Sequence, residues 1–114
     1  MARSQKIPTL SIIIPTLNEA LHLPLLLSDL NVWPNDFELI IVDGGSIDLT
    51  ISIAQIQGVD VIKSPKKNRG YQLKTGASNA RGDWLLFLHA DSRLRIGWVR
   101  SLSEIIQNQK SKNF

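Results

Sequence analysis

Cysteine is absent from this 114-residue sequence. Its absence excludes a disulfide-stapled scaffold, a thiolate zinc site and a cysteine nucleophile, and it fits a reducing compartment. Long hydrophobic runs are absent too, since the longest, Trp84–Leu88, is too short to cross a bilayer. Hydrophobic residues at 43% and charged residues at 20% are ordinary globular values, which excludes collagen, coiled-coil and disordered classes. We therefore expect one cytoplasmic domain or part of one.

Charge of neither sign dominates, because the formal net charge is only +3. The basic residues are nevertheless uneven, and six of them lie between positions 63 and 81. This cluster predicts either a solvated face or a patch that meets phosphates, and the sequence favours neither. No zinc finger, basic zipper or aromatic RNA-binding motif is present, so we expect no nucleic-acid partner. The six are Lys63, Lys66, Lys67, Arg69, Lys74 and Arg81.

Four short apolar and β-branched runs predict strands, at residues 9–14, 37–43, 59–63 and 83–88. They are nearly continuous rather than alternating, which is typical of parallel strands covered on both faces. Pro15 follows the first run directly, and we expect it to end that strand.

Helical spacing fills the segments between these strands and follows the last one. Pro24 is predicted in the first turn of the first helix, Ser46 as the N-cap of the second and Asp48 in its first turn. The order β-α-β-α-β-α-β-α predicts an α/β fold, a parallel β-sheet with flanking helices. The apolar stripes are Leu23, Leu26, Leu27 and Leu30; Ile47, Ile51 and Ala54; Leu73, Ala77 and Ala80; and Trp98, Leu102 and Ile105.

Polar side chains follow the first two predicted strands. Thr16 and Asn18 come after the first strand and can contact a polar ligand. Asp43 ends the second strand, where a carboxylate can accept from a base N–H or a ribose hydroxyl, and glycines after it permit a close approach. Because ligands bind at the carboxyl ends of parallel strands, both loops are candidate site elements. Ordinary capped turns are the alternative explanation for each.

The loops after the third and fourth strands carry charge. Arg69 is predicted at the start of a helix, where it can meet an anion. His89 and Asp91 lie two residues apart, so in an extended segment their side chains project to the same side and can hold a divalent cation. A flexible basic loop and a capped turn are the respective alternatives.

Together these motifs resemble the nucleotide-sugar-binding half of a family 2 glycosyltransferase with the GT-A fold, a Rossmann-like arrangement. The resemblance rests on Ser11–Glu19, Ile41–Ser46 with Asp48 and Thr50, Asn68–Gly70, Gly76–Ala77 and Gly82–Asp91. It implies inverting transfer of a sugar from a nucleotide-diphosphate sugar to an acceptor. Lipid or polysaccharide acceptors are common in the family, so the resemblance also implies the inner face of the plasma membrane as an alternative, peripheral location. The donor-binding residues it implies are Pro15, Thr16, Asn18, Glu19, Asp43, Gly44, Ser46, Arg69, His89 and Ala90.

The resemblance also implies a metal. Asp91 matches the last residue of the family's D-x-D element, which binds Mg²⁺ or Mn²⁺ and the diphosphate. His89 stands at the first position, so this chain carries a His-Ala-Asp form, in which metal binding is weaker or His89 bonds a phosphate oxygen instead.

No residue of the chain matches the family's general base, which we expect beyond Phe114 with the acceptor half. Residues 1–114 would then be a partial domain with an uncovered sheet edge, in need of a complementing chain. A non-catalytic nucleotide-sugar-binding fragment or pseudoenzyme is the alternative. A receiver-like domain with Asp43 as phosphoacceptor is a third possibility.

Overall fold

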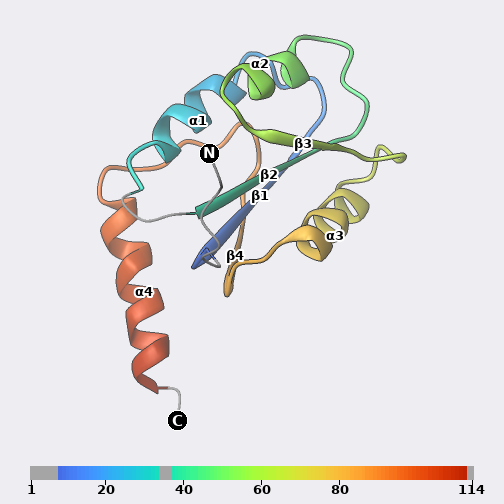
Figure 1. Ribbon diagram of the computed structural model, residues 1–114. Helices are drawn as coiled ribbons and strands as arrows, with labels where there is room; N and C mark the ends of the chain where they lie inside the picture. Colours follow the sequence, from blue (N-terminus) through green and yellow to red (C-terminus); the bar gives the residue numbers. More distant parts are fainter. Residues whose placement is uncertain (1–7, 34–36, 113–114) are drawn as a thin grey trace, which may run out of the picture.

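The computed structural model describes residues 8–33 and 37–112. Its centre is a four-stranded sheet in the order β3-β2-β1-β4, and all three neighbouring pairs are parallel. The predicted parallel α/β architecture is therefore confirmed (Figure 1). The strands are β1 (Leu10–Thr16), β2 (Phe37–Asp43), β3 (Asp60–Lys63) and β4 (Trp84–Phe87).

Helices cover both faces of this sheet. One face packs against α1, α2 and α4 through residues that include Leu10, Ile12 and Ile14. The other face packs against α3, with Ile13 and Val42 at its centre. Burial on both faces is the reason why β1 is apolar at nearly every position rather than at alternate ones. The helices are α1 (Leu23–Leu30), α2 (Thr50–Ile56), α3 (Arg69–Asn79) and α4 (Trp98–Lys112).

Gly76 lets α3 lie close to the sheet. A Cβ atom at this position would come within 2.4 Å of Ile13 Cγ2 and 3.2 Å of Val42 Cγ2. Glycine is a poor helix former, so its presence in the middle of α3 is explained by this close approach.

The order in which strands are added to the sheet reverses at β1. From β1 the chain adds β2 and then β3 on one side; α3 then crosses back over the sheet, and β4 is added on the other side of β1. Consequently α1 and α3 leave the sheet on opposite faces, and the carboxyl ends of β1 and β4 flank a crevice. Open α/β sheets bind their ligands at such a point.

Three local expectations are wrong. Pro15 does not end β1, because the strand continues to Thr16. Proline is tolerated here since β4 already ends at Phe87, opposite Ile13, so the missing N–H of Pro15 costs no hydrogen bond to β4. The N-cap of α2 is Leu49 rather than Ser46, and Asp48 lies before the helix.

Two apolar stripes are also displaced from the predicted positions. Ile47 lies in a loop and is 94% exposed. On α4 Ile106 is buried, and Trp98, Val99 and Leu102 pack on the core with it, while Ile105 lies to the side of this face and is 52% exposed. Pro24 does lie at the start of α1, as predicted.

The outer edge of β4 is apolar and open among the described residues. Leu85 and Phe87 are 42% and 46% exposed, because α3 packs mainly on β1 and β2. An edge with no charged side chain is a template for further strand pairing.

Candidate nucleotide-sugar site

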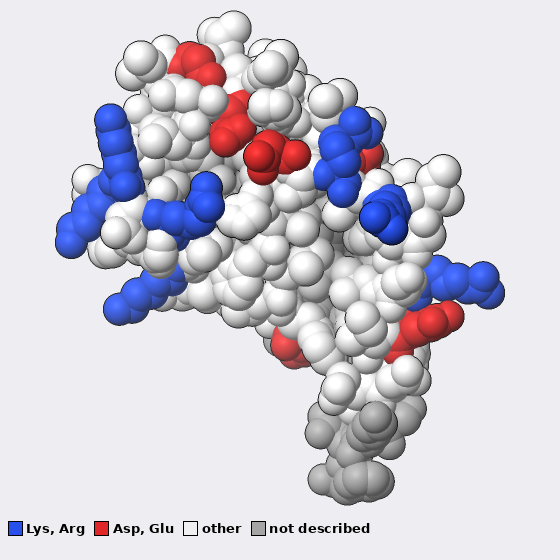
Figure 2. Space-filling model, turned by 180° about the vertical axis from the view of Figure 1, so that it is seen from behind, with Lys and Arg blue, Asp and Glu red and all other residues white. Residues whose placement is uncertain are grey.

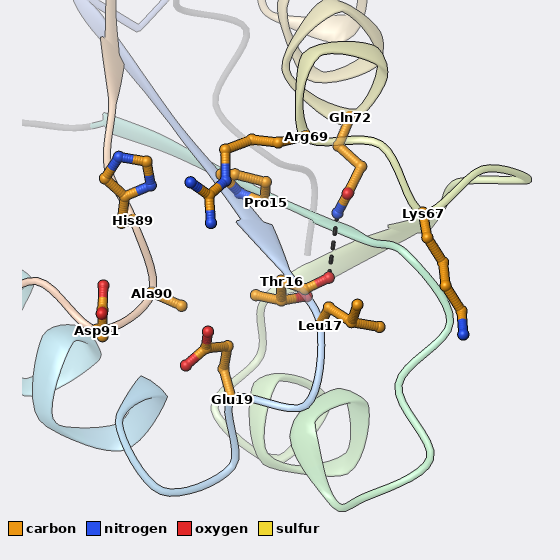
Figure 3. Close-up of a pocket in the computed structure, with 10 residues that line it drawn as sticks. All are labelled: Pro15, Thr16, Leu17, Glu19, Lys67, Arg69, Gln72, His89, Ala90 and Asp91. Atoms are coloured by element: carbon orange, nitrogen blue, oxygen red, sulfur yellow. Dashed lines mark hydrogen bonds between the residues drawn. The ribbon is translucent and has the colours of Figure 1, made fainter.

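A cavity of about 330 Å³ opens at the carboxyl edge of the sheet. Its walls come from the ends of β1 and β4 and from the loop that leads into α3, so it occupies the crevice where the chain reverses direction (Figure 3). The lining residues are Pro15, Thr16, Leu17, Glu19, Lys67, Arg69, Gln72, His89, Ala90 and Asp91.

Seven of the sequence-predicted site residues line this cavity, and four do not. Those in the lining are Pro15, Thr16, Glu19, Arg69, His89, Ala90 and Asp91. Asn18, Asp43, Gly44 and Ser46 lie at the same edge of the sheet, beyond the lining. Register places Asp43 directly beside Thr16, so the two groups are adjoining parts of one region.

Asp43 is buried in a cage of donors. Its Oδ1 accepts from the Thr16 hydroxyl at 2.7 Å and from the Ser46 hydroxyl at 2.5 Å. Its Oδ2 accepts from the backbone N–H groups of Gly45 at 2.9 Å and Ser46 at 2.7 Å. Burial alone would raise the pKa of Asp43, but these hydrogen bonds outweigh it and hold the pKa below its ordinary value. The carboxylate is therefore ionised and joins the ends of β1 and β2.

Asn18 links the loop after β1 to the loop after β2. Its backbone N–H donates to the Ser46 hydroxyl, and its side-chain oxygen accepts from the N–H of Ile47, both at 2.8 Å. Asn18 has a φ of 55°, a left-handed conformation that asparagine tolerates better than most residues. Ser46 is thus a loop linker here, which accounts for its position outside α2.

A second pair of bonds extends this link. The N–H of Glu19 donates to the Thr50 hydroxyl at 2.8 Å, and the N–H of Ala20 donates to Asp48 Oδ2 at 3.1 Å. Asp48 Oδ1 accepts from both the N–H and the hydroxyl of Thr50, which lowers the pKa of Asp48. Asp48 therefore holds the start of α2 from outside the helix. These bonds, together with those of Asn18, fix the backbone of the loop after β1, from which the Glu19 side chain reaches the cavity.

Cationic side chains enter from the β3–α3 side. Arg69 is the first residue of α3, and Figure 3 shows its guanidinium extending toward β1. Lys67 also lines the cavity, whereas Lys66 lies over the Tyr71 ring at 5.0 Å from its centroid. Arg81 pairs with Glu38 at 3.0 Å, near the amino end of β2. The basic cluster of the sequence is thus divided: two of its members face the cavity, and others lie on the surface that carries β3 and α3 (Figure 2).

The segment after β4 is a turn rather than an extended strand. The N–H of Ser92 donates to the carbonyl of His89 at 3.0 Å, so the chain reverses at Ala90 and Asp91. The expectation that His89 and Asp91 project from an extended segment is therefore wrong, although both line the cavity. In Figure 3 the His89 ring lies toward Arg69, and the Asp91 carboxylate lies toward the Glu19 side.

Carboxylates form the other charged part of the lining. Glu19 and Asp91 come from different loops, and Glu19 is 3.5 Å from His22 Nδ1. Among residues 8–33 and 37–112, no three His, Asp or Glu side chains converge closely enough to hold a metal ion by themselves. One or two carboxylates are, however, the protein share of many Mg²⁺ sites in which phosphates and waters complete the shell.

Three lining residues escaped the sequence analysis as site residues: Leu17, Lys67 and Gln72. Lys67 belongs to the basic cluster, and membership of that cluster is the only feature of the sequence that pointed to a role in the site. Gln72 lies one helical turn after Arg69, so helical spacing places both on one face of α3.

The comparisons with known proteins agree with this geometry. Residues 11–112 match the family model described as Glycosyl transferase family 2. The chain belongs to this family. The predicted resemblance is thereby confirmed, and the receiver-like alternative is set aside.

A related mycobacterial protein, the PGL/p-HBAD biosynthesis glycosyltransferase Rv2957 of Mycobacterium tuberculosis, is 44% identical over 94 residues. That alignment covers 76% of this chain and 37% of the relative, so the chain spans little more than a third of the relative's length.

Solved structures share the fold. Residues 1–349 of TarS from S. aureus, in complex with UDP, match with a TM-score of 0.77 at 23% identity, over 88% of this chain and 32% of the TarS chain in that structure. The mannosyltransferase PcManGT from Pyrobaculum calidifontis, in complex with GDP-Man and Mn²⁺, matches with a TM-score of 0.77 at 19% identity, over 90% and 32% of the two chains. The GT-A fold expectation is therefore confirmed. No helix within the described ranges is long and apolar enough to span a membrane.

Proposed function

We propose that this chain binds the nucleotide-diphosphate sugar of a glycosyltransferase that moves the sugar to an acceptor. The observation that carries the proposal is the cavity at the carboxyl ends of β1 and β4, whose lining combines the cations Arg69 and Lys67 with the carboxylates Glu19 and Asp91. A diphosphate needs cations, and a metal that accompanies it needs carboxylate oxygens. Family membership and the UDP and GDP-Man bound in similar folds support the same function.

Arg69 and Lys67 would bind the diphosphate. Arg69 starts an 11-residue helix, so the phosphate would meet the guanidinium together with the partial positive charge of the helix N-terminus. Lys67 adds a mobile point charge from the adjoining loop, and the turn after β4 presents His89 as a further donor to a phosphate oxygen.

Asp91 would provide the protein's carboxylate to Mg²⁺ or Mn²⁺. The donor set fits such an ion, since hard cations prefer oxygen ligands and accept a shell made largely of phosphates and waters. Bound there, the ion would neutralise charge on the departing diphosphate. A manganese ion accompanies GDP-Man in the PcManGT structure, and we extend the presence of such an ion to this chain.

The acceptor and the general base would belong to a part of the protein outside residues 1–114. Inverting transfer requires a base that takes the proton of the acceptor hydroxyl. Because the chain spans 37% of the mycobacterial relative, it would supply the donor-binding half, and a lipid or polysaccharide acceptor would meet the remainder or a complementing chain.

Nucleotide titration tests this function. We expect the purified chain to bind UDP or GDP more tightly with Mn²⁺ than without it. Asp91→Ala should lose that gain, about tenfold or more, since an interaction with a charged group contributes about 1.5–3 kcal/mol. Asp60→Ala is the matched control, because Asp60 is exposed at the start of β3, away from the cavity. Equal affinity of wild type and Asp91→Ala in Mn²⁺ would refute the role of Asp91.

Donor binding without turnover is the second candidate, favoured by the share of the relatives that the chain spans. Single-turnover assays with a radiolabelled nucleotide sugar separate the two. Hydrolysis or transfer by the purified chain would exclude a purely binding role, whereas binding alone would support it.

A further inference from the structure

Gln72 is an unusual polar residue at the floor of the cavity. It comes from α3, on the face of the sheet opposite to α1, and only 5% of its surface is exposed. Its side-chain Nε2 donates to the carbonyl of Val42 at 2.8 Å. The same nitrogen donates to the carbonyl of Thr16 at 3.1 Å, the bond that Figure 3 shows. A single side chain therefore ties together the carboxyl ends of β1 and β2.

These two bonds determine the orientation of the amide. Only the NH₂ group can donate to two carbonyls, so the oxygen Oε1 must point away from both. No described residue donates a hydrogen bond to Oε1. Among the described residues, Trp33 Nε1 is the one fully buried side-chain polar atom that lacks a partner. Oε1 also lacks a partner but is not in that class, so part of its surface is open to solvent. Since Gln72 lines the cavity, its Oε1 is a fixed acceptor offered to a ligand.

The surroundings of Oε1 suit a flat heterocycle. Gly44 lets the Gln72 amide lie close to the loop after β2, since a Cβ at that position would lie 3.1 Å from Oε1 and 3.2 Å from Cδ and Nε2. Leu17 lines the same cavity and contributes partly exposed apolar surface. A nucleobase has an apolar face and a polar edge, so it matches an apolar wall next to one oriented acceptor. The cations and carboxylates, in contrast, suit the diphosphate.

We propose that Gln72 is a base-recognition residue, whose Oε1 accepts a hydrogen bond from the ring N–H of uracil N3 or guanine N1. This proposal rests on the proposed function, because it concerns the nucleotide of the same donor. It assigns to Gln72 the base contact that the sequence had suggested for Asp43, whose two carboxylate oxygens already accept four hydrogen bonds within the protein.

A methylated ligand isolates this one bond. Isothermal titration compares UDP with 3-methyl-UDP, and GDP with 1-methyl-GDP, on wild type, Gln72→Met and Gln55→Met. In the pair that binds more tightly, wild type and Gln55→Met should favour the unmethylated ligand about tenfold, the worth of one good hydrogen bond. Gln55 is exposed on α2 and controls for the chemical change itself. In Gln72→Met the preference should fall to about two-fold or less.

Gly44→Ala provides a second variant in case Gln72→Met does not fold. The added methyl group would crowd the whole Gln72 amide, with Oε1 at 3.1 Å and Cδ and Nε2 at 3.2 Å, and shift it from its position, so it should also reduce the preference. An equal preference in wild type and both variants, or no preference in wild type, would overturn the role of Gln72 and leave nucleotide binding intact. Failure of wild type to bind either UDP or GDP would instead refute the proposed function.

Discussion

Replacement of Asp43 by asparagine should destabilise the fold strongly. Asparagine keeps one acceptor oxygen, which can replace Oδ1 toward Thr16 and Ser46, but its NH₂ group then faces the N–H groups of Gly45 and Ser46. A buried donor that loses its acceptor costs about 1–3 kcal/mol. Two such donors at the edge of the loop, within reach of water, predict a loss of about 2–4 kcal/mol in the free energy of unfolding.

Urea denaturation followed by circular dichroism measures this loss. The midpoint should fall while the slope of unfolding free energy against urea stays the same, since the variant buries the same surface. Asp60→Asn serves as the control, because Asp60 is exposed and surface changes of this kind stay within about 0.5 kcal/mol. A loss below about 1 kcal/mol for Asp43→Asn would refute the view that this carboxylate joins β1 to β2.

The pH dependence gives an independent check. The pKa of Asp43 is lowered in the folded protein, so its contribution is fully present above the ordinary carboxyl pKa of about 3.9 and is lost as the pH falls through the lower folded value. Wild type should therefore lose more stability than Asp43→Asn on acidification below about pH 4. Parallel curves for the two proteins would contradict the hydrogen-bond account.

Two further predictions concern α3 and the outer edge of the sheet. Gly76→Ala should lower the free energy of unfolding by about 1–3 kcal/mol, although alanine is the better helix former, because its Cβ would overlap Ile13. Ser78→Ala, on the exposed side of α3, is the control and should change the stability to urea little. A stabilised Gly76→Ala protein would disprove the close packing of α3 on the sheet. Phe87→Lys should reduce self-association in sedimentation velocity, since a charge on an edge strand opposes further pairing. Ile56→Lys, which replaces an exposed apolar residue on α2, is its control, and an equal reduction by both variants would show that the β4 edge is not responsible.

Much of the cavity could be anticipated from the sequence, and the reason is topological. Once the strands are known to be parallel, their carboxyl ends must meet at one edge, so residues such as Thr16, Arg69 and Asp91 are brought together without knowledge of side-chain detail. The predicted role of a residue was wrong where a tertiary contact competes with its local conformational preference. Ser46 is a good N-cap type, yet its hydroxyl donates to Asp43 and accepts from Asn18 instead.

Local pattern alone determined the alternation of strands and helices, the parallel class of the sheet and the family motifs, because apolar periodicity and turn residues act between neighbours in the chain. Only the tertiary structure decided how the loops after β1 and β2 are joined and that Gln72 reaches the carbonyl of Thr16, 56 residues away. Contacts of that kind depend on the strand order β3-β2-β1-β4 and on which face each helix covers. Neither is encoded in the spacing of nearby residues, since both emerge when the whole sheet buries its two apolar faces at once.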